Sequence, residues 1–218
     1  MSKRYTQAQV ALQRRFEVEA LATVMQTAVI RSELSERDKA FVEARDMFFL
    51  ATVDSAGQPT CSYKGGDPGF VNVLDSRTLL FPIYEGNSMY LSAGNIVETS
   101  RVGMLFVDFE TPQRLRVEGI AETLYDESHR SRFPEAQLVI RVSVISVFVN
   151  CPRFVHKYAR AGSSKYVPRS GQETPFAQWK RIEAFQDALP QRDAEKVAVN
   201  GGVITTDEYR RKVARGDA

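Results

Sequence analysis

The sequence predicts a mainly β fold with helical additions, in which about six or seven short strands form a small antiparallel barrel. Apolar residues recur with period two from Met47 to residue 150, in short runs separated by Gly, Asn, Asp and Ser. Longer segments with helical periodicity lie in the two flanks of this block. At 218 residues the whole chain can be one barrel domain.

The N-terminal flank is predicted to be helical. Over residues 7–29, Phe16, Leu21 and Val24 belong to a rough apolar face among Glu and Arg residues. Ser35 is expected to cap a second helix over residues 35–45, with Asp38 at its third position. We expect residues 1–45 to form a helical lead-in that packs on the barrel or on a partner subunit.

The barrel core is assigned to residues 46–150. MFFLATV and PTCSYK are expected to form a hairpin around Asp54-Ser55-Ala56-Gly57, because Asp and Gly suit a tight turn. The later strands are expected in FVNVLD, TLLFPIY, VGMLFVDF, RLRVEGIAETLY and LVIRVSVISVFVN. The last of these is apolar on both faces, so we place it centrally in the sheet. GNSMYLSAGNIVETS is predicted as a short helix, and residues 126–137 as a short crossover.

The C-terminal flank, residues 151–218, is expected to belong to the same single domain. Its first part is rich in Gly, Pro and Ser and is predicted to be an ordered loop. An amphipathic helix is expected next, with apolar residues at three- and four-residue steps: Phe176, Trp179, Ile182 and Phe185. Residues 190–218 are polar and are expected to form an arm or a peripheral turn.

Charge and hydropathy exclude several classes of protein. With 29 basic and 27 acidic residues, the net charge of +2 gives no argument for binding to nucleic acid or to an anionic membrane. The longest apolar runs have the length of strands, well short of the roughly 20 residues of a membrane span. The first 20 residues lack the apolar core of a secretory signal, so we expect a cytoplasmic protein.

The remaining residue types give few signs of other sites. Cys61 and Cys151 are predicted to be reduced, buried thiols, with a disulfide or a reactive thiol as the alternatives. His129 and His156 stand in no recognised ligand spacing with them, so we expect no metal. The segment KGGDPG lacks the residue order of a P-loop, and no GxGxxG follows a strand.

The block from Met47 to Gly119 has the composition of a site for a flat aromatic ligand with an anionic tail. Turns rich in Gly, Asn and Ser expose main-chain N–H groups, and an extended strand over residues 61–64 can donate to a ring edge. Lys64 lies at a strand end and supplies positive charge. A helix start near Ser88, with Ser92 following, presents free N–H groups and hydroxyls to a phosphate.

Five motifs in this block follow one another in a familiar order: DSAGQP, SYK, GNSMYLSAGN, VGMLF and RLRVEG. With these motifs, residues 35–190 resemble the pyridoxamine 5′-phosphate oxidase-like proteins, a family of FMN-binding split barrels. The resemblance implies an antiparallel, Greek-key-like split β-barrel with FMN as its cofactor. It also implies a homodimer with the flavin at the subunit interface and a small-molecule substrate.

The resemblance also implies which residues contact the cofactor: Ser62, Tyr63 and Lys64 on the first strand, Phe81, Pro82 and Ile83 beside the ring, Asn87, Ser88, Met89, Ser92 and Asn95 at the phosphate, and Arg114 and Trp179. For some of these residues the residue type is also consistent with a purely structural role. Phe81 and Met89 are also typical of ordinary core, Lys64 of a solvated strand end, and Asn87 and Asn95 of turns or caps.

The chain departs from the family pattern at several points. The basic strand of the true oxidases is reduced here to PTCSYK, and the phosphate-binding segments GNSM and SAGN contain no basic residue. Arg114 stands where a glutamine is usual, and either stabilises an anionic reduced flavin or is a surface arginine. Near Trp179 the histidine of the substrate signature is absent. The segment around Arg153, His156 and Lys157 either lines a substrate mouth, binds a cofactor phosphate from across a dimer, or is a solvated loop.

From these features we predict an FMN-binding flavoprotein that acts as an oxidoreductase on a small molecule. No catalytic residue is assigned, because electron transfer through a flavin requires no protein nucleophile. The alternative is a non-catalytic flavin or haem binding or storage protein. A true pyridoxamine 5′-phosphate oxidase ranks third, because its substrate signature is missing.

Overall fold

The computed structural model describes residues 5–217 and divides into two compact units. The first extends to Ser163 and contains the sheet, and the second begins at Ser164.

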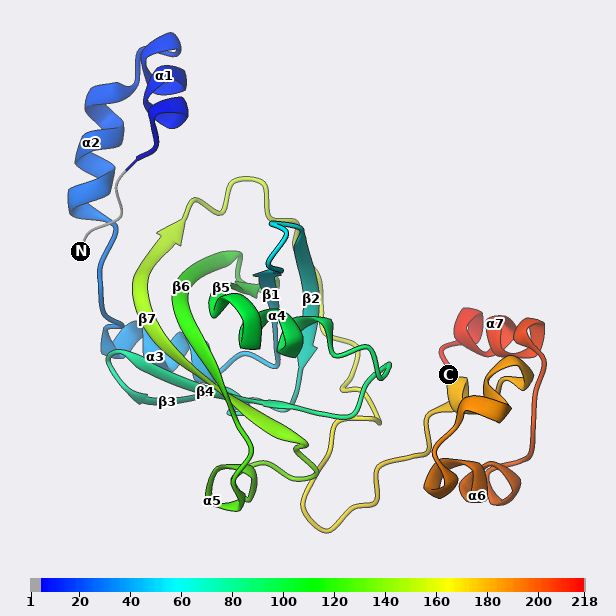
Figure 1. Cartoon of the computed structure of the whole chain (residues 1–218). Helices are drawn as coiled ribbons and strands as arrows, with labels where there is room; N and C mark the ends of the chain where they lie inside the picture. Colours follow the sequence, from blue (N-terminus) through cyan, green and yellow to red (C-terminus); the bar gives the residue numbers. More distant parts are fainter. Residues whose placement is uncertain (1–4, 218) are drawn as a thin grey trace. The chain divides into compact units, whose positions relative to one another are not determined.

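The first unit is built on one seven-stranded sheet, in the order β2-β1-β5-β6-β7-β4-β3 (Figure 1). Every neighbouring pair of strands is antiparallel. The strands are β1 (Met47–Val53), β2 (Pro59–Gly65), β3 (Asn72–Asp75), β4 (Thr78–Ile83), β5 (Arg101–Asp108), β6 (Gln113–Leu124) and β7 (Leu138–Asn150). The structure confirms the mainly β fold, and β7 lies inside the sheet as its doubly apolar pattern predicts.

The sheet curls around its own core. β1 and β4 are separated by three strands in the sheet order. The rings of Phe48 on β1 and Phe81 on β4 nevertheless meet edge to face, with centroids 5.1 Å apart. Phe48 also packs against Phe106 of β5, at 5.1 Å. Side chains therefore close a split barrel, although its two edge strands, β2 and β3, are not hydrogen-bonded neighbours.

Two glycines allow features of the barrel that a side chain would obstruct. Gly57, in the predicted turn between β1 and β2, has φ +85°, which glycine adopts without strain. At Gly119 the register of β6 against β7 shifts. A Cβ there would lie 2.6 Å from Cγ1 of Val142, so only glycine fits this bulge.

The N-terminal residues form three helices where the sequence predicts two. α1 (Gln7–Arg15) and α2 (Glu19–Ala28) are separated at Glu17, whose φ of +58° breaks the predicted single helix over residues 7–29. The third, α3 (Glu36–Glu43), begins at the predicted cap. Ser35 accepts from the Asp38 N–H while the Asp38 carboxylate accepts from the Ser35 N–H, which completes a capping box.

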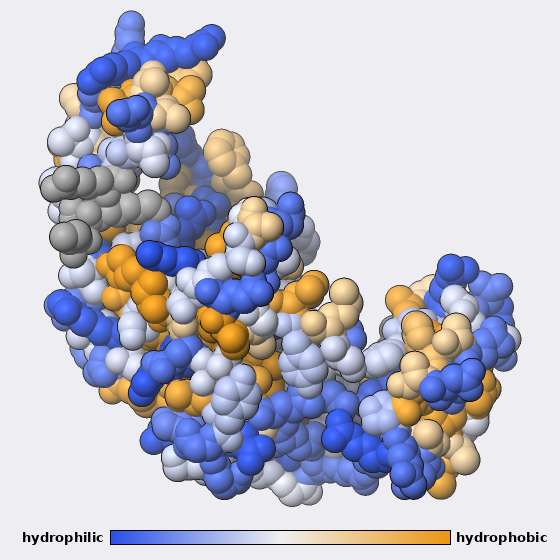
Figure 2. All heavy atoms as spheres, viewed as in Figure 1, coloured by the Kyte–Doolittle hydropathy of each residue, from blue (hydrophilic) through white to orange (hydrophobic). Residues whose placement is uncertain are grey.

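The α1–α2 hairpin buries none of its residues. Its two helices are tied by the Tyr5 hydroxyl, which donates to the carbonyl of Ala22 at 3.0 Å. Apolar side chains are visible on its surface in Figure 2, and those that are exposed are Leu12, Phe16, Val18, Leu21, Val24 and Met25. No helix among the described residues combines the length and the hydropathy of a membrane span.

Two more helices lie between strands of the first unit. α4 (Leu91–Thr99) packs against β1, β2, β5 and β6 (Figure 1). It begins later than predicted, because Ser88 has φ +62° and Tyr90 φ +50°, conformations outside an α-helix. α5 (Glu127–Arg130) is a single turn in the predicted crossover, capped by Asp126.

The second unit differs from its prediction. The predicted amphipathic helix is two 3₁₀ helices, η1 (Gln178–Arg181) and η2 (Glu183–Ala188), separated at Ile182. Ile182 adopts an extended conformation there and forms a parallel bridge with Ile204. Residues expected as an arm form α6 (Gln191–Val199) and α7 (Thr206–Arg215).

A buried ion pair joins the helices of this second unit. Lys180 Nζ lies 2.8 Å from Asp193 Oδ2, and both side chains are buried. Arg181 donates to the carbonyl oxygens of Gly201 and Gly202, at 2.6 and 2.7 Å. These contacts satisfy polar groups that the fold removes from water, and they connect η1 to α6 and to the turn before α7.

Candidate functional site

β2 exposes part of its main chain along the edge of the sheet. The N–H of Asp54 donates to the carbonyl of Gln58 at 3.1 Å, and hydrogen-bonded pairs alternate along an antiparallel ladder. In the observed register Ser62 therefore pairs its main chain with Leu50. The N–H and C=O groups of Cys61 and Tyr63 point away from β1, toward the free edge. Residues 61–64 were predicted to donate main-chain hydrogen bonds to a ligand. Only every second residue, Cys61 and Tyr63, has its main-chain groups free to do so.

The inner face of β2 is joined to α4 by polar side chains. Ser62 Oγ lies 2.7 Å from Ser92 Oγ in the first turn of α4. One turn further along, Asn95 Nδ2 donates to the hydroxyls of Thr52 and Thr60, at 3.0 and 3.3 Å. The structure thus brings together three predicted site residues: Ser62, Ser92 and Asn95. Asn95 holds the helix on the hairpin and is not a turn residue.

Thr52 and Thr60 are part of this arrangement and were not predicted. Their hydroxyls lie 2.8 Å apart, across the hairpin. The predicted turn contained the necessary signal, since it places Thr52 opposite Thr60. Period-two alternation then puts both side chains on the inner face.

Lys64 lies on this same inner face, two residues beyond Ser62. Its side chain is partly buried, and burial lowers the pKa of its ammonium group. Among the described residues no acceptor or carboxylate pairs with it. Desolvation of an uncompensated cation is costly, so this position favours an anion.

The N-terminus of α4 lies next to this hydroxyl pair. The capping residue, Tyr90, makes no side-chain hydrogen bond to the first turn. Its hydroxyl instead donates to Gln137 Oε1 at 2.6 Å. The first N–H groups of the helix therefore have no side-chain acceptor, an arrangement that attracts anions.

The loop before α4 carries three predicted residues, Asn87, Ser88 and Met89, all of them exposed. Asn87 Oδ1 accepts from the N–H of Met89 at 3.1 Å. This is the turn role that the sequence offered as the alternative to a cofactor contact. Met89 is 61% exposed, so its side chain is not part of the core of this chain.

The predicted ring wall lies deeper in the barrel. Phe81, Pro82 and Ile83 on β4 are all buried, and Phe81 belongs to the aromatic cluster around Phe48. Tyr84 follows them and was not predicted. Burial, reinforced by the charges of Asp67 and Glu135, raises the pKa of Tyr84 to about 12. Its phenol therefore stays a hydrogen-bond donor at neutral pH.

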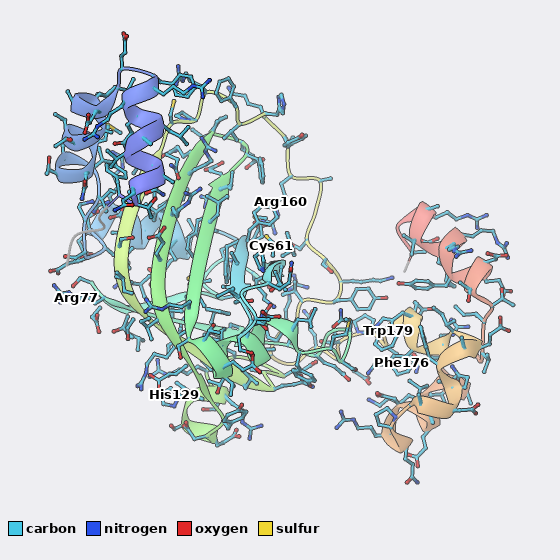
Figure 3. The ribbon with its side chains drawn as sticks, turned by 45° about the horizontal axis from the view of Figure 1, so that its top comes forward. Cys61, Arg77, His129, Arg160, Phe176 and Trp179 are labelled. Carbon is cyan, nitrogen blue, oxygen red and sulfur yellow. The ribbon has the colours of Figure 1, made fainter. Side chains whose placement is uncertain are left out.

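Tyr63 projects from the opposite face of β2. Its ring packs edge-on against Phe49, with centroids 6.2 Å apart. Burial and then the charge of Asp46 raise the pKa of Tyr63, while Arg160 opposes them. Arg160 Nε lies 3.0 Å from Asp46 Oδ2, and Figure 3 shows Arg160 in the region of Cys61 on β2. The coil after β7 therefore passes close to Asp46, just before β1.

The last two predicted residues belong to elements other than β2 and α4. Arg114 is near the start of β6, and its Nη2 donates to the carbonyl of Cys151. Trp179 belongs to the second unit (Figure 3). There it packs edge-on against Phe185, with ring centroids 5.8 Å apart. The two cysteines are free, as predicted, but both are exposed and not buried.

The described residues include no group of three or more His, Cys, Asp and Glu side chains arranged to hold a metal ion. The polar groups on the inner face and free edge of β2 include an ammonium, hydroxyls, the Asn95 amide and main-chain N–H and C=O groups. These groups recognise an anion and the hydrogen-bonding edge of a ring.

Solved structures with a similar fold come from several bacteria. HupZ of Group A Streptococcus is 19% identical, with a TM-score of 0.45 over 58% of this chain and 99% of that chain. An FMN-binding protein of Syntrophomonas wolfei is 11% identical, with a TM-score of 0.44 over 64% and 97%. HutZ, the heme storage protein of Vibrio cholerae, is 20% identical, with a TM-score of 0.41 over 53% and 94%. At these values none of them assigns a ligand to this chain.

A comparison with the curated proteins finds no match. The family model for pyridoxamine 5′-phosphate oxidase, however, matches residues 34–149. The match covers more than half of the 218 residues and includes all seven strands up to the penultimate residue of β7. It confirms the resemblance that the five motifs indicate, and the chain belongs to the pyridoxamine 5′-phosphate oxidase family.

Proposed function

We propose that this protein binds FMN at β2 and α4. The observation that carries the proposal is Lys64, a partly buried cation for which the described residues supply no counter-charge. It lies on the same face as the Ser62–Ser92 pair, next to the N-terminus of α4. A phosphate bound there would neutralise the ammonium group and accept from the helix N–H groups.

The hydroxyl pair can also donate to that phosphate. Two hydroxyls contain two protons, and the contact between Ser62 and Ser92 uses one of them. The other remains available. Asn95 fixes α4 against the hairpin, so these groups are held in place before the ligand arrives.

The free edge of β2 fits the hydrogen-bonding edge of the flavin ring. That edge presents two carbonyl oxygens and one N–H, and the main chain of Cys61 and Tyr63 offers both donors and acceptors. Because only the main chain is used, the site tolerates the loss of the family's basic side chains from PTCSYK.

We further propose that the protein is a homodimer with the flavin at the subunit interface. Exposed apolar side chains on the outer face of the sheet support this proposal, among them Tyr63, Ile120 and Ile145. A second subunit would remove this surface from water. It would also cover a flavin that lies along the edge of β2.

The proposed activity is flavin-dependent oxidoreduction of a small molecule. Bound FMN supplies hydride and electron transfer. The residues of this chain bind and orient the ring and exclude water from it, and Tyr84 is a phenol that remains protonated at neutral pH. None of these steps requires a dedicated acid or base.

The first test is the absorbance spectrum of the purified protein, followed by titration with FMN. We expect a flavin absorbance band at about 450 nm, typical of oxidised flavins, and binding at micromolar FMN or below. Lys64→Ala should weaken FMN binding by about 1–3 kcal/mol, because it removes a charge-assisted hydrogen bond. Lys196→Ala, at an exposed position of α6, is the matched control. A colourless protein that binds no added FMN would contradict the proposal.

A second test separates an enzyme from a binding protein. Rapid bleaching of the flavin band by NADH or NADPH, with recovery in air, is expected of the oxidoreductase. Stable colour under the same conditions would favour a storage or sensing role. Binding of haem with no binding of FMN would replace the cofactor assignment.

A further inference from the structure

A second polar cluster surrounds Cys151, directly after β7. Arg153 Nε donates to Cys151 Sγ at 3.2 Å. Arg114 reaches the same residue from β6, where it is the cross-strand partner of Asn150, and donates to the Cys151 carbonyl. Two guanidinium groups thus converge on one exposed cysteine.

The charges of this cluster are not balanced. Among the described residues, no carboxylate forms an ion pair with Arg114 or Arg153. Arg114 Nε is buried without a hydrogen-bond partner. Such groups usually have partners in folded proteins. The Cys151 thiolate and a bound anion are the species that would compensate two adjacent cations.

The same surroundings favour ionisation of the thiol. The Arg153 main-chain N–H is the largest influence that lowers the pKa of Cys151, and burial opposes it. The Arg153 side chain and the charges of both arginines lower it further. A thiolate is the reactive form in exchange with disulfides.

We propose that Cys151, with Arg114 and Arg153, is a modification site at which the protein exchanges with small anionic disulfides. The Cys151 thiol releases its proton to solvent, and the sulfur attacks one sulfur of the disulfide. The disulfide bond breaks, a thiolate leaves, and a mixed disulfide forms on Cys151. The small disulfide is the oxidant, and a small thiol reverses the step. The two guanidiniums attract the carboxylates of the reagent.

Cys151 is exposed, and so is the residue next to Arg153. Phe154, next to Arg153, is 84% exposed, and the Arg153 guanidinium lies over its ring at 5.7 Å. Cys61 provides an internal comparison. It is also exposed, but it faces Ala51 across the hairpin, and among the described residues no arginine forms a hydrogen bond with its sulfur.

The experiment compares two single-thiol proteins, Cys61→Ser and Cys151→Ser. Each is reacted at pH 7 with the dianionic 5,5′-dithiobis(2-nitrobenzoate) and with the neutral 2,2′-dithiodipyridine. We expect the protein that retains Cys151 to react with the anionic reagent at least about tenfold faster than the protein that retains Cys61. Oxidised glutathione should add a mixed disulfide at Cys151, visible as a mass shift of that peptide.

Two variants in the Cys61→Ser background test the role of charge. Arg153→Gln should reduce the preference for the anionic over the neutral reagent several-fold. Arg153→Lys keeps the charge and should retain the preference. Arg153 is exposed, so both variants are expected to fold, which circular dichroism verifies. Equal rates at the two cysteines, or a preference unchanged in Arg153→Gln, would overturn the proposal.

Discussion

The inward side chains at the two ends of β2 are all polar, but those at one end have partners and the one at the other end has none among the described residues. At its first end, Thr60 and Ser62 find partners on β1 and α4. At its last end, Lys64 finds none among the described residues. Polar groups that serve the fold are paired. A partly buried cation without a partner reduces stability, which is why we propose an anionic ligand for Lys64. The predictions below test this contrast, beginning with the core that both ends share.

The largest effect is expected in the aromatic core. Phe48→Ala should lower the free energy of unfolding by about 3–5 kcal/mol, because it removes the ring on which β1, β4 and β5 meet. Phe49→Ala, on the outer face, should cost clearly less. Urea unfolding of both variants measures the difference. Equal losses would mean that the barrel is not closed by its inner face.

The paired end of β2 should depend on Asn95. Asn95→Ala should lower the free energy of unfolding by about 1–3 kcal/mol, because it leaves Thr52 and Thr60 without their shared donor. Asn87→Ala, in the exposed loop, is the control and should change it little. If the two losses were similar, the contacts between α4 and the hairpin would not stabilise the fold.

Replacing Lys64, at the unpaired end of β2, should have the opposite effect on stability. Lys64→Met should raise the free energy of unfolding of the FMN-free protein by about 0.5–2 kcal/mol, while FMN binding weakens. Since burial lowers the pKa of Lys64, the unfolded chain binds this proton more tightly.

The rise in free energy of unfolding caused by Lys64→Met should therefore be full at neutral pH. It should shrink as pH rises through the pKa of Lys64 in the folded protein. Urea unfolding at neutral and alkaline pH, with and without FMN, measures both effects. Loss of stability in Lys64→Met without FMN would show that Lys64 has a structural role.

Asp38, a paired carboxylate outside the site, should make a smaller contribution to the free energy of unfolding, and this contribution should depend on pH in the acid range. Burial alone would raise the pKa of Asp38, but hydrogen bonds from Arg31 and Ser35 outweigh it and hold the pKa below its usual range. Its contribution is complete above the unfolded-state pKa of about 3.9 and is lost as pH falls through the folded-state value.

Asp38→Asn should therefore reduce stability at pH 7, and its difference from the unmodified protein should narrow as pH falls below about 4. Urea midpoints across this range measure the narrowing. A difference that does not change with pH would remove the ion pair with Arg31 as its cause.

The sequence predicted those features that depend on neighbouring residues or on simple alternation. The Ser35–Asp38 capping box, the Asp54–Gly57 turn and the seven strands follow from local patterns and were found. The α1–α2 break was missed because Glu17 adopts a left-handed conformation that its residue type does not favour. The C-terminal helices were missed because their core includes Lys180 and Asp193, which a hydropathy pattern reads as surface.

The sequence by itself determined the family and the hairpin that carries Lys64. It also determined which residues along each strand face inward and which face outward. Only the tertiary structure decided which polar groups have partners. Whether Asn95 meets two threonines, whether Lys64 meets a carboxylate, and whether two arginines converge on Cys151 depend on strands and helices distant in the chain. Their hydrogen bonds and charges take effect only once folding brings them together and excludes water.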